Sequence, residues 1–313
     1  MILVVSYPGE EHTIDVMQRL ERQGREVCLV DLSDFPARPL ELSWSSDDAP
    51  IYLMGGPSGS VNLKEARVAW WRRVRSFSID SKIVKPSHRA FAESETAQAV
   101  HGLFDALPCR WVNPRCADEA AHHKPYQWAV AHEIGLRLPR TLVTNQPDAA
   151  RKFVGEMGEG RTIFKAFLAS IEEWRETRLV RQDDLERLDL VRYAPVIFQE
   201  YIEGVDLRIT VIGEKVFAAE IDARKTSYPV DMRMVIGETS IRPVELPPGI
   251  LKSLLELQRR LGLDYGAIDM RRTPAGEYFF FEVNPAGQWL FVEQKTGLEI
   301  SQAVTDFLST FDQ

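Results

Sequence analysis

The sequence has little cysteine and no long hydrophobic run. Its three cysteines, Cys28, Cys109 and Cys116, are an odd number without C-x-x-C spacing, so neither a disulfide framework nor a zinc site is indicated and we expect reduced thiols. The N-terminal apolar run, MILVV, is too short for a membrane helix and lacks the basic flank of a signal peptide. We therefore expect a cytoplasmic protein with no membrane partner.

Positive charge is also in deficit. Lys and Arg total 38 against 46 Asp and Glu, which gives a net charge of -8. Because this balance repels phosphate backbones, we expect no nucleic-acid partner, although a local basic patch is compatible with an acidic whole. The chain has no G-x-x-x-x-G-K-[ST] motif, which argues against a Walker-type nucleotide fold. Hydrophobic residues make up 44% and charged residues 27%, the balance of an ordinary soluble protein.

The order of apolar runs predicts an α/β domain followed by α+β regions. Residues 2–5 and 27–30 are short apolar runs on either side of a stretch in which Ile14, Met17 and Leu20 recur at helical spacing, so the chain opens as a β-α-β unit. A chain of 313 residues is expected to form two or three domains of about 100 to 200 residues each. We predict an N-terminal α/β domain over 1–113, a small central lid over 114–203 and a C-terminal domain over 204–313.

Two predicted strands near the C-terminus carry oxygen-bearing side chains. The segments YGAIDMR and EYFFFEVN flank the turn segment 273–276, a pattern typical of a β-hairpin. Because side chains alternate along a strand, Glu282 and Asn284 share one face, and a loop of even length brings Asp269 onto it. Phe280 is expected beside them, and the side chains expected to face the core are Phe279, Phe281 and Val283.

Two carboxylates and one amide oxygen on one patch of sheet would suit Mg²⁺, which prefers oxygen ligands and is often held partly by nucleotide phosphates. Carboxylates inside apolar runs are costly unless they are paired or bound to a cation. The plainer alternative is that each is hydrogen-bonded at a strand end or partly solvated. These residues alone leave both readings open.

The segment EVNPAG, which follows a strand carrying AIDM, resembles the metal-binding signature of ATP-grasp ligases such as glutathione synthetase and the ribosomal-protein glutamate ligase. Further segments occur in that family's order: HHKPYQWAVAHEIGLRLPRTLVT, TIFKAF and FQEYIEGVDLRITVIGEKVFAAEID. More narrowly, AWWRRVR, DLRITVIG, a DMR segment, YGAIDM and EVNPAGQW together resemble the microviridin-type (graspetide) peptide-macrocyclising ligases. The resemblance covers nearly the whole chain and implies an ATP-grasp fold with an N-terminal pre-ATP-grasp domain, a lid and a C-terminal domain.

The resemblance implies phosphate-binding roles for two lysines. Lys165 lies between apolar residues on a predicted strand, and the corresponding lysine of the family contacts nucleotide phosphates. Lys124 precedes Pro125 at a predicted helix start, where the exposed N–H groups also attract anions. The alternatives are an edge lysine that extends to water for Lys165 and a solvated lysine for Lys124.

The same resemblance assigns the nucleoside end of the site. The segment Gln199, Glu200, Tyr201, Ile202 corresponds to the hinge whose main chain meets adenine at positions such as Glu200 and Ile202, and its alternative is an ordinary linker strand. Asp206 corresponds to the acidic residue that binds a ribose hydroxyl. Arg208, two residues further and so on the same strand face, would contact the transferred phosphate. A surface ion pair between Asp206 and Arg208 is the alternative.

One segment departs from the wider family. After its EID strand the ribosomal-protein glutamate ligase carries a basic, glycine-rich substrate loop, whereas this chain reads ARKTSYPVDMRMVIGE. Arg224, Asp231 and Arg233 are candidates to orient an acidic side chain of the substrate, and Arg233 could hold the donor carboxylate by a paired hydrogen bond. A solvated charged loop is the alternative.

These implications define the expected activity, which requires ATP and Mg²⁺. A side-chain carboxylate of a ribosomal precursor peptide would become an acyl phosphate, and a Lys amine or a Ser or Thr hydroxyl would then form a macrocyclic amide or ester. Such enzymes recognise a leader segment of the peptide. The alternatives are a ligase that adds a free amino acid to a peptide or protein and an ATP-binding regulatory module without turnover; an intact Asp269, Glu282 and Asn284 set speaks against the latter. Homodimerisation is left open.

Overall fold

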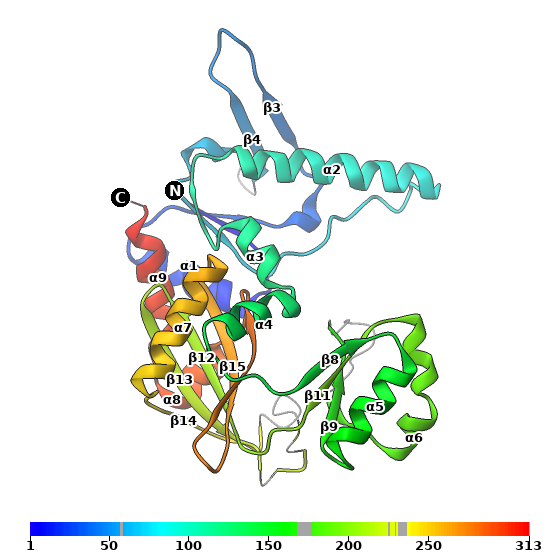
Figure 1. The fold of residues 1–313 in the computed structure, drawn as a ribbon. Coiled ribbons are helices and arrows are strands. Elements are labelled where there is room, and N and C mark those ends of the chain that lie inside the picture. The colour runs from blue at the N-terminus through cyan, green and yellow to red at the C-terminus, as the bar shows by residue number, and fades with distance from the viewer. Residues whose placement is uncertain (57–58, 168–176, 225, 229, 231–236, 313) are drawn as a thin grey trace. The chain divides into compact units, whose positions relative to one another are not determined.

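The computed structural model describes residues 1–312 apart from 57–58, 168–176, 225, 229 and 231–236 (Figure 1). The chain folds as two compact units, each built from separate stretches of sequence. Unit 1 consists of Met1–Asp118, Gly262–Tyr265 and Glu299–Gln313, and unit 2 of Glu119–Leu261 and Gly266–Leu298. The three-domain division over 1–113, 114–203 and 204–313 stays a prediction. The structure adds that residues 299–313 at the C-terminal end belong to unit 1.

Unit 1 is built on a parallel sheet with strand order β2-β1-β6-β7. Its strands are short and mostly apolar. The two central strands, β1 and β6, are the most buried, because each has a strand on either side of it in the sheet. The β-α-β opening is confirmed, since β1 and β2 pair in parallel across an intervening helix. The elements are β1 (Ile2–Val5), α1 (Glu11–Arg22), β2 (Val27–Val30), η1 (Leu32–Asp34), β6 (Val68–Trp71), α2 (Pro86–Ala106), β7 (Arg110–Val112), α3 (Arg115–Ala121, which ends in unit 2) and α9 (Ile300–Thr310).

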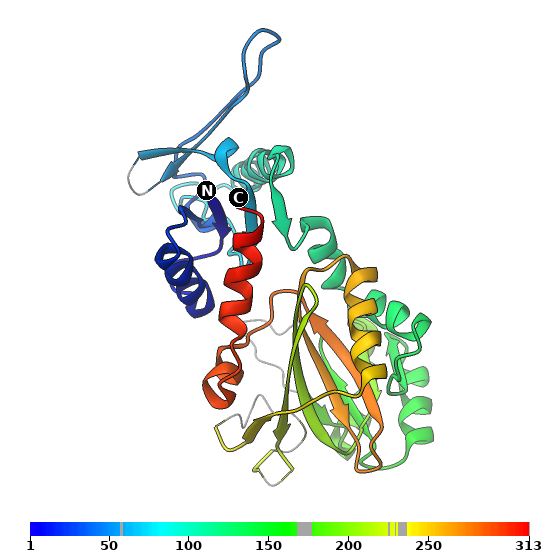
Figure 2. The same cartoon turned by 90° about the vertical axis from the view of Figure 1, so that its left-hand side faces the viewer.

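A second, antiparallel sheet projects from unit 1 as a hairpin (Figures 1 and 2). It consists of β3 (Leu40–Ser43), β4 (Ile51–Gly56) and β5 (Gly59–Asn62), followed by η2 (Leu63–Glu65). The core of unit 1 lies between α2 and the parallel sheet, and its largest members include Leu3, Phe35, Leu103 and Phe104.

The returning segments of unit 1 are fixed by polar contacts. Asn113, at the end of β7, accepts hydrogen bonds from the main-chain N–H groups of Asp264 and Tyr265 at 2.9 and 2.7 Å and donates to the carbonyl of Tyr265 at 3.1 Å. Helix α9 packs against α1, and the N-terminal amine lies 3.0 Å from a carboxylate oxygen of Asp312. These contacts explain why residues far apart in sequence share one unit.

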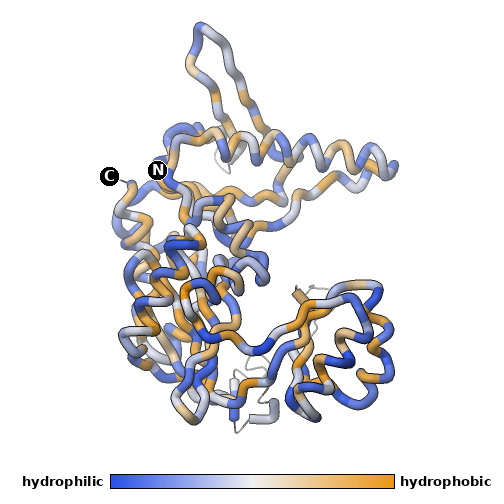
Figure 3. Tube along the Cα trace, in the orientation of Figure 1, coloured by the Kyte–Doolittle hydropathy of each residue, from blue (hydrophilic) through white to orange (hydrophobic). Residues whose placement is uncertain are grey.

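Unit 2 contains two antiparallel sheets. The smaller has the order β10-β9-β11-β8 and corresponds to the predicted lid. Its core joins the strands to α5 and η3 through residues such as Val154, Leu188 and Phe198. Figure 3 shows the hydrophobic strands of this sheet beside helices in which hydrophobic and hydrophilic residues alternate along the chain. The elements are α4 (Lys124–Glu133), β8 (Thr141–Thr144), α5 (Pro147–Met157), β9 (Thr162–Lys165), β10 (Arg178–Leu179), α6 (Gln182–Glu186), η3 (Leu188–Tyr193) and β11 (Val196–Glu200).

The larger sheet of unit 2 carries the candidate site. Its order is β14-β13-β12-β15-β16, and α7 lies along one face of it (Figures 1 and 2). Helix α7 approaches β15 closely, because a Cβ on Gly266 of β15 would lie 2.5 Å from the side-chain amide nitrogen of Gln258 in α7. The elements are β12 (Val205–Ile212), β13 (Lys215–Asp222), β14 (Ser240–Pro243), α7 (Pro248–Leu261), β15 (Tyr265–Arg272), β16 (Tyr278–Asn284) and α8 (Leu290–Thr296). Among the described residues, no helix has the length and apolarity that crossing a bilayer requires.

Candidate active site on the larger sheet of unit 2

The hairpin β15–β16 brings the three predicted oxygen ligands onto one face. Asp269 pairs directly with Glu282 and Ala267 with Asn284, and directly opposed residues of an antiparallel pair project to the same side. The Asp269 and Glu282 side chains are 22% and 23% exposed and Asn284 is exposed, whereas Val283 between them is buried. The shared face agrees with the prediction, and the role of these residues as metal ligands stays a prediction.

The predicted places of the aromatic residues on β16 were wrong. The pairing of the hairpin shifts between Asp269 and Met270, so that Phe281 is an extra residue, a β-bulge. Phe280 is consequently in the core and fully buried, whereas Phe281 is only partly buried. Its ring centroid lies 5.9 Å from Nζ of Lys165. Phe279 is also partly exposed, and the guanidinium of Arg137 lies 5.6 Å from its ring.

Arg208 of β12 is held against the carboxylate of Asp269. Its Nη1 lies 2.8 Å from Oδ1 of Asp269, and its Nη2 donates to the carbonyl of Gln288 at 2.9 Å. A Cβ on Gly287 would lie 2.8 Å from this guanidinium and 2.3 Å from Cβ of Ala267, so glycine is required there for the EVNPAG turn to approach the sheet. The contacts give Arg208 a fixed direction toward the face that carries Asp269, Glu282 and Asn284.

Lys124 contacts the same face from helix α4. Its Nζ lies 2.5 Å from Oε2 of Glu282. The helix begins at Lys124 with Pro125 in its first turn, as predicted. Two residues of α4 that the sequence reasoning missed fix the helix to β16: Gln127 bonds both the N–H and the carbonyl of Val283 at 2.8 Å, and the indole of Trp128 donates to the carbonyl of Phe281 at 2.8 Å. The signal that could have found Gln127 is its spacing, because it precedes Val130 and Ala131 by three and four residues and so shares their buried helix face.

The predicted hinge runs from β11 into β12. Gln199 is buried and its amide donates to Oγ1 of Thr141 at 2.9 Å. The N–H of Glu200 donates to the carbonyl of Arg140 and that of Tyr201 to the carbonyl of Arg161, both at 2.8 Å. The carbonyl of Ile202 accepts from Arg271 of β15 at 2.9 Å. The predicted hinge is thus attached on both sides, to residues that flank the strands of the smaller sheet and to the larger sheet.

Asp206 pairs with Arg271 of β15. The Nε of Arg271 donates to Oδ1 of Asp206 at 2.8 Å, and both residues are buried. The alternative of a surface ion pair between Asp206 and Arg208 is therefore wrong, because each pairs across the sheet with a residue of β15. Sequence reasoning missed Arg271, since its partner is distant in the chain.

The substrate candidates are described only in part. Arg224 forms a two-pronged ion pair with Asp222, at 2.9 and 2.8 Å, and is half exposed. Asp231 and Arg233 lie outside the described residues. The role of all three in orienting a substrate carboxylate stays a prediction.

The site face therefore combines oxygen donors with cations. Asp269, Glu282 and Asn284 supply carboxylate and amide oxygens, the donor set that suits Mg²⁺ in company with phosphate. Within the described part of the chain, no three His, Cys, Asp or Glu side chains are grouped as a metal site of their own.

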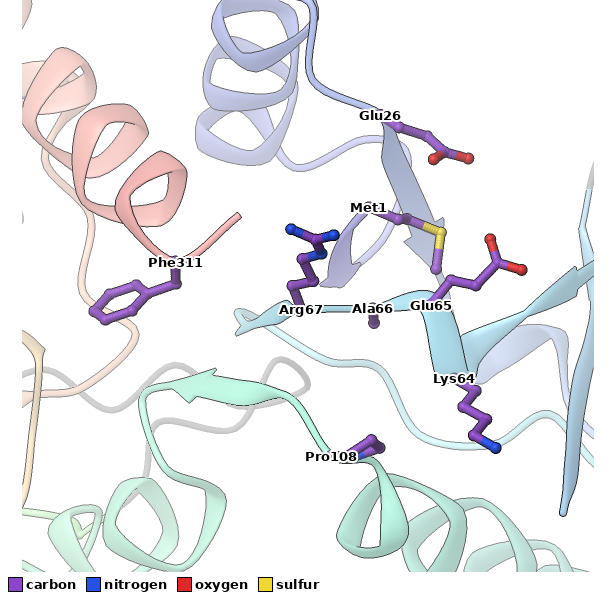
Figure 4. Close-up of a pocket in the computed structure, with 8 residues that line it drawn as sticks. All are labelled: Met1, Glu26, Lys64, Glu65, Ala66, Arg67, Pro108 and Phe311. Atoms are coloured by element: carbon purple, nitrogen blue, oxygen red, sulfur yellow. The ribbon is translucent and has the colours of Figure 1, made fainter. Parts of the chain in front are cut away.

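A separate hollow of about 640 Å³ lies on unit 1 (Figure 4). It is lined by Met1, Glu26, Lys64, Glu65, Ala66, Arg67, Pro108 and Phe311. Met1, Glu26 and Arg67 directly precede β1, β2 and β6, so this hollow lies at the amino ends of the parallel strands. Ligands of open α/β sheets bind outside the carboxyl ends, and we assign no ligand to the hollow.

Comparisons with known proteins agree with the fold. Residues 1–119 match the family model described as the MvdD pre-ATP grasp domain. The macrocyclase MdnB from Microcystis aeruginosa is 30% identical, with a TM-score of 0.83 over 98% of both chains. An ATP-grasp ligase from Chryseobacterium gregarium, described as RiPP-associated and solved with ADP and a leader and core peptide, is 26% identical, with a TM-score of 0.88 over 99% of this chain and 96% of that one.

A curated relative adds the wider family. The probable alpha-L-glutamate ligase 2 of Shewanella amazonensis is 27% identical over 182 residues, and the match spans 56% of this chain and 58% of the relative's length. The ATP-grasp fold predicted from the sequence is thus confirmed, and the shared activity of these proteins is ligation. The chain belongs to the ATP-grasp ligases, in the group of the microviridin-type peptide macrocyclases.

Proposed function

We propose that this ligase forms macrocyclic ester or amide bonds between side chains of a ribosomally made precursor peptide, at the expense of ATP. The observation that carries the proposal is the face of the larger sheet on which Lys124 and Arg208 contact the carboxylates of Glu282 and Asp269. The site lies in a chain that matches a solved macrocyclase over nearly its full length.

The nucleotide would be held at two ends. The hinge main chain at Glu200 and Ile202 would meet the adenine edge, and Asp206 would accept a ribose hydroxyl. Asp269, Glu282 and Asn284 would hold magnesium, which when bound neutralises phosphate charge and aligns the terminal phosphate. Lys124, Lys165 and Arg208 would neutralise the charge that develops on the transferred group.

The reaction has two steps. A substrate carboxylate attacks the terminal phosphorus of ATP, which forms an acyl phosphate and releases ADP. The amine or hydroxyl of a second side chain then attacks the acyl carbon, loses one proton, and displaces inorganic phosphate. Arg233, with Arg224 and Asp231, would orient the donor carboxylate for the first step.

Leader recognition completes the proposal. A leader segment bound away from the reacting groups raises the effective concentration of the core segment, which can then be held loosely while different rings form. A free amino acid would instead need a compact site that contacts both its ends.

Mass spectrometry of the purified enzyme with ATP, magnesium and a candidate precursor peptide tests this function. We expect a loss of about 18 mass units per bond, because each ester or amide formed expels water overall, with stoichiometric ADP. The loss should require the leader segment. A gain of one amino-acid residue from a pool of free amino acids would contradict the macrocyclase activity, and a phosphorylated peptide would indicate a kinase.

A further inference from the structure

We propose that Arg271 is a positioning residue for the nucleoside half of ATP, which it serves without touching the reacting atoms. The inference rests on the proposed function, because it concerns the same nucleotide site. Arg271 lies on β15, two residues after Asp269 and therefore on the same face of the strand. It links the two groups expected to bind adenine and ribose.

The geometry of the contacts is specific to a guanidinium. The Nη1 of Arg271 donates to the carbonyl of Ile202 at 2.9 Å, and its Nε donates to Oδ1 of Asp206 at 2.8 Å. Because both donors belong to one rigid plane, the distance between the hinge carbonyl and the carboxylate is fixed by the side chain. A lysine has a single ammonium group on a flexible stem and could not hold both groups in this relation.

The plane of the guanidinium is itself held by aromatic rings. Its central carbon lies 5.7 Å from the ring centroid of Tyr201, on the hinge, and 5.5 Å from that of Phe281, on β16. Phe281 is available for this contact because the β-bulge makes it an extra residue of the strand. Arg271 is only 5% exposed, and in such an environment a charged hydrogen bond is stronger than at the surface.

An independent observation shows that the hinge is pressed onto β15. A Cβ on Gly204, between Ile202 and Asp206, would lie 2.2 Å from the carbonyl oxygen of Arg272 and 3.1 Å from Cγ of Arg271. No side chain fits there without moving main chain. Gly204 and Arg271 therefore keep one short segment in place, the first by close approach and the second by hydrogen bonds.

The consequence is a division of labour within the nucleotide site. Lys124 and Arg208 contact the carboxylates of Glu282 and Asp269. Arg271 instead donates to the carbonyl of Ile202 in the hinge, to Asp206 and to the carbonyl of Val230, and among the described residues these are its polar partners. Loss of Arg271 should therefore weaken binding of the nucleoside and leave binding of bare phosphate chains unchanged.

Binding measurements on the full chain test this inference. The probes are ADP and inorganic tripolyphosphate, each with magnesium, titrated into the wild type and Arg271→Met by calorimetry. We expect the Kd for ADP to rise by about tenfold or more, since a charged hydrogen bond contributes about 1.5 to 3 kcal/mol. The Kd for tripolyphosphate should change by less than about twofold. Arg271→Lys should recover little of the lost affinity, because one ammonium cannot serve both acceptors.

Arg272→Met is the matched control. Arg272 is the next residue of β15 and contacts Glu220 of β13, so its loss removes an ion pair of the same sheet without touching the hinge. We expect its Kd for ADP to stay within about twofold of the wild type. Gly204→Ala should weaken ADP binding in the same selective way as Arg271→Met, because it displaces the same segment.

Three outcomes would overturn the inference: an unchanged Kd for ADP in Arg271→Met, a parallel loss of ADP and tripolyphosphate affinity, or an equal effect in Arg272→Met. A wild type that binds neither probe would instead contradict the proposed function itself. The two failures are thus distinguishable.

Discussion

Two groups of charged side chains, one in each unit, use the same residue types for different ends. In unit 1, Glu10, His12 and Arg72 form a cluster in which no residue is more than 4% exposed. In unit 2, Asp269 and Glu282 pair with cations but keep 22% and 23% of their side chains exposed. The first cluster is closed by protein groups, and the second is open on one side. The candidate site therefore differs from the cluster in unit 1 by the solvent exposure of its carboxylates and not by the presence of charged groups.

The closed cluster supports the start of helix α1. Oε1 of Glu10 lies 2.8 Å from Nδ1 of His12 and 3.6 Å from Nη2 of Arg72, and its Oε2 accepts from the N–H and the hydroxyl of Thr13 at 2.7 and 2.8 Å. Burial by itself raises the pKa of Glu10, but the bond with His12 and the charge of Arg72 outweigh it and bring the pKa to about 2. For His12 burial has the opposite sign and lowers the pKa, because it disfavours the charged imidazolium. At neutral pH a carboxylate, a neutral imidazole and a guanidinium therefore coexist.

The largest expected effect comes from breaking the open site. Glu282→Gln keeps the size of the side chain and removes the charge that would bind magnesium. Because stabilisation of the transferred phosphate depends on that ion, we expect turnover to fall by about a thousandfold or more. The fold should persist, since the side chain is partly exposed and its neighbour Val283 keeps both bonds to Gln127. ADP release with a precursor peptide measures the rate, and circular dichroism checks the fold.

The matched control for this variant is Glu277→Gln. Glu277 lies at the other end of the same hairpin, beside Arg137, with 45% of its side chain exposed. An exposed pair of this kind contributes little, and we expect near wild-type turnover. If Glu282→Gln retained turnover within about tenfold of this control, the metal assignment would be wrong.

The next largest effect comes from breaking the closed cluster. A fall in the pKa of Glu10 from 4.5 to about 2 corresponds to about 3 kcal/mol of stability as an upper value. Because the pKa is lower in the folded state, this stabilisation is fully present above pH 4.5 and is lost as the pH falls to about 2. Glu10→Gln should lose most of it at neutral pH and show a shallower acid limb over that window. Its turnover per folded molecule should stay unchanged.

Hydrogen exchange of peptides from α1, followed from pH 7 downward, measures this loss in unit 1 alone. Glu11→Gln is the control, since Glu11 lies in the first turn of α1 but is exposed. An acidic residue at that place interacts with the helix dipole for about 0.3 to 1 kcal/mol. Equal protection in the two variants would show that Glu10 is not the stabilising member of the cluster.

The sequence could predict that Asp269 and Glu282 share one face of the hairpin, because the alternation of strands and the turn chemistry of 273–276 are local properties. It could not predict the bulge. Residues 279–281 are all phenylalanine, so the hydrophobic pattern is the same in either register and the choice depends on packing against α4. The bond from Trp128 to the carbonyl of Phe281 belongs to that packing.

Long-range partners were equally out of reach. Arg271 and Asp206 are 65 positions apart. Strand alternation places Arg271 on the face of Asp269, but nothing local indicates which residues it contacts. The segment AWWRRVR likewise contains three arginines, of which Arg72 alone is buried. The family resemblance supplied the candidate ligands and lysines, whereas the groups that position them became visible only through the sheet topology.

The smallest expected effect sharpens the comparison at Lys124, the cation that the open site would have to release. Its Nζ lies 2.5 Å from Oε2 of Glu282, with both side chains about one-fifth exposed, so a metal ion that binds Glu282 without nucleotide must displace it. Such partly exposed pairs are worth about 1 kcal/mol or less. We therefore expect Lys124→Met to bind Mn²⁺ alone about three- to fivefold more tightly, which electron paramagnetic resonance can measure. With ATP present Lys124 would contact phosphate, so the same variant should bind Mg-ATP more weakly.

Lys152→Met is the control. Lys152 is 79% exposed and forms a weak ion pair with Glu156 at 4.0 Å, so its loss should change neither the affinity for Mn²⁺ nor the affinity for Mg-ATP. If both affinities of Lys124→Met moved in the same direction, Lys124 would not exchange a carboxylate for phosphate, and the open site would be closed by protein groups just as the cluster around Glu10 is.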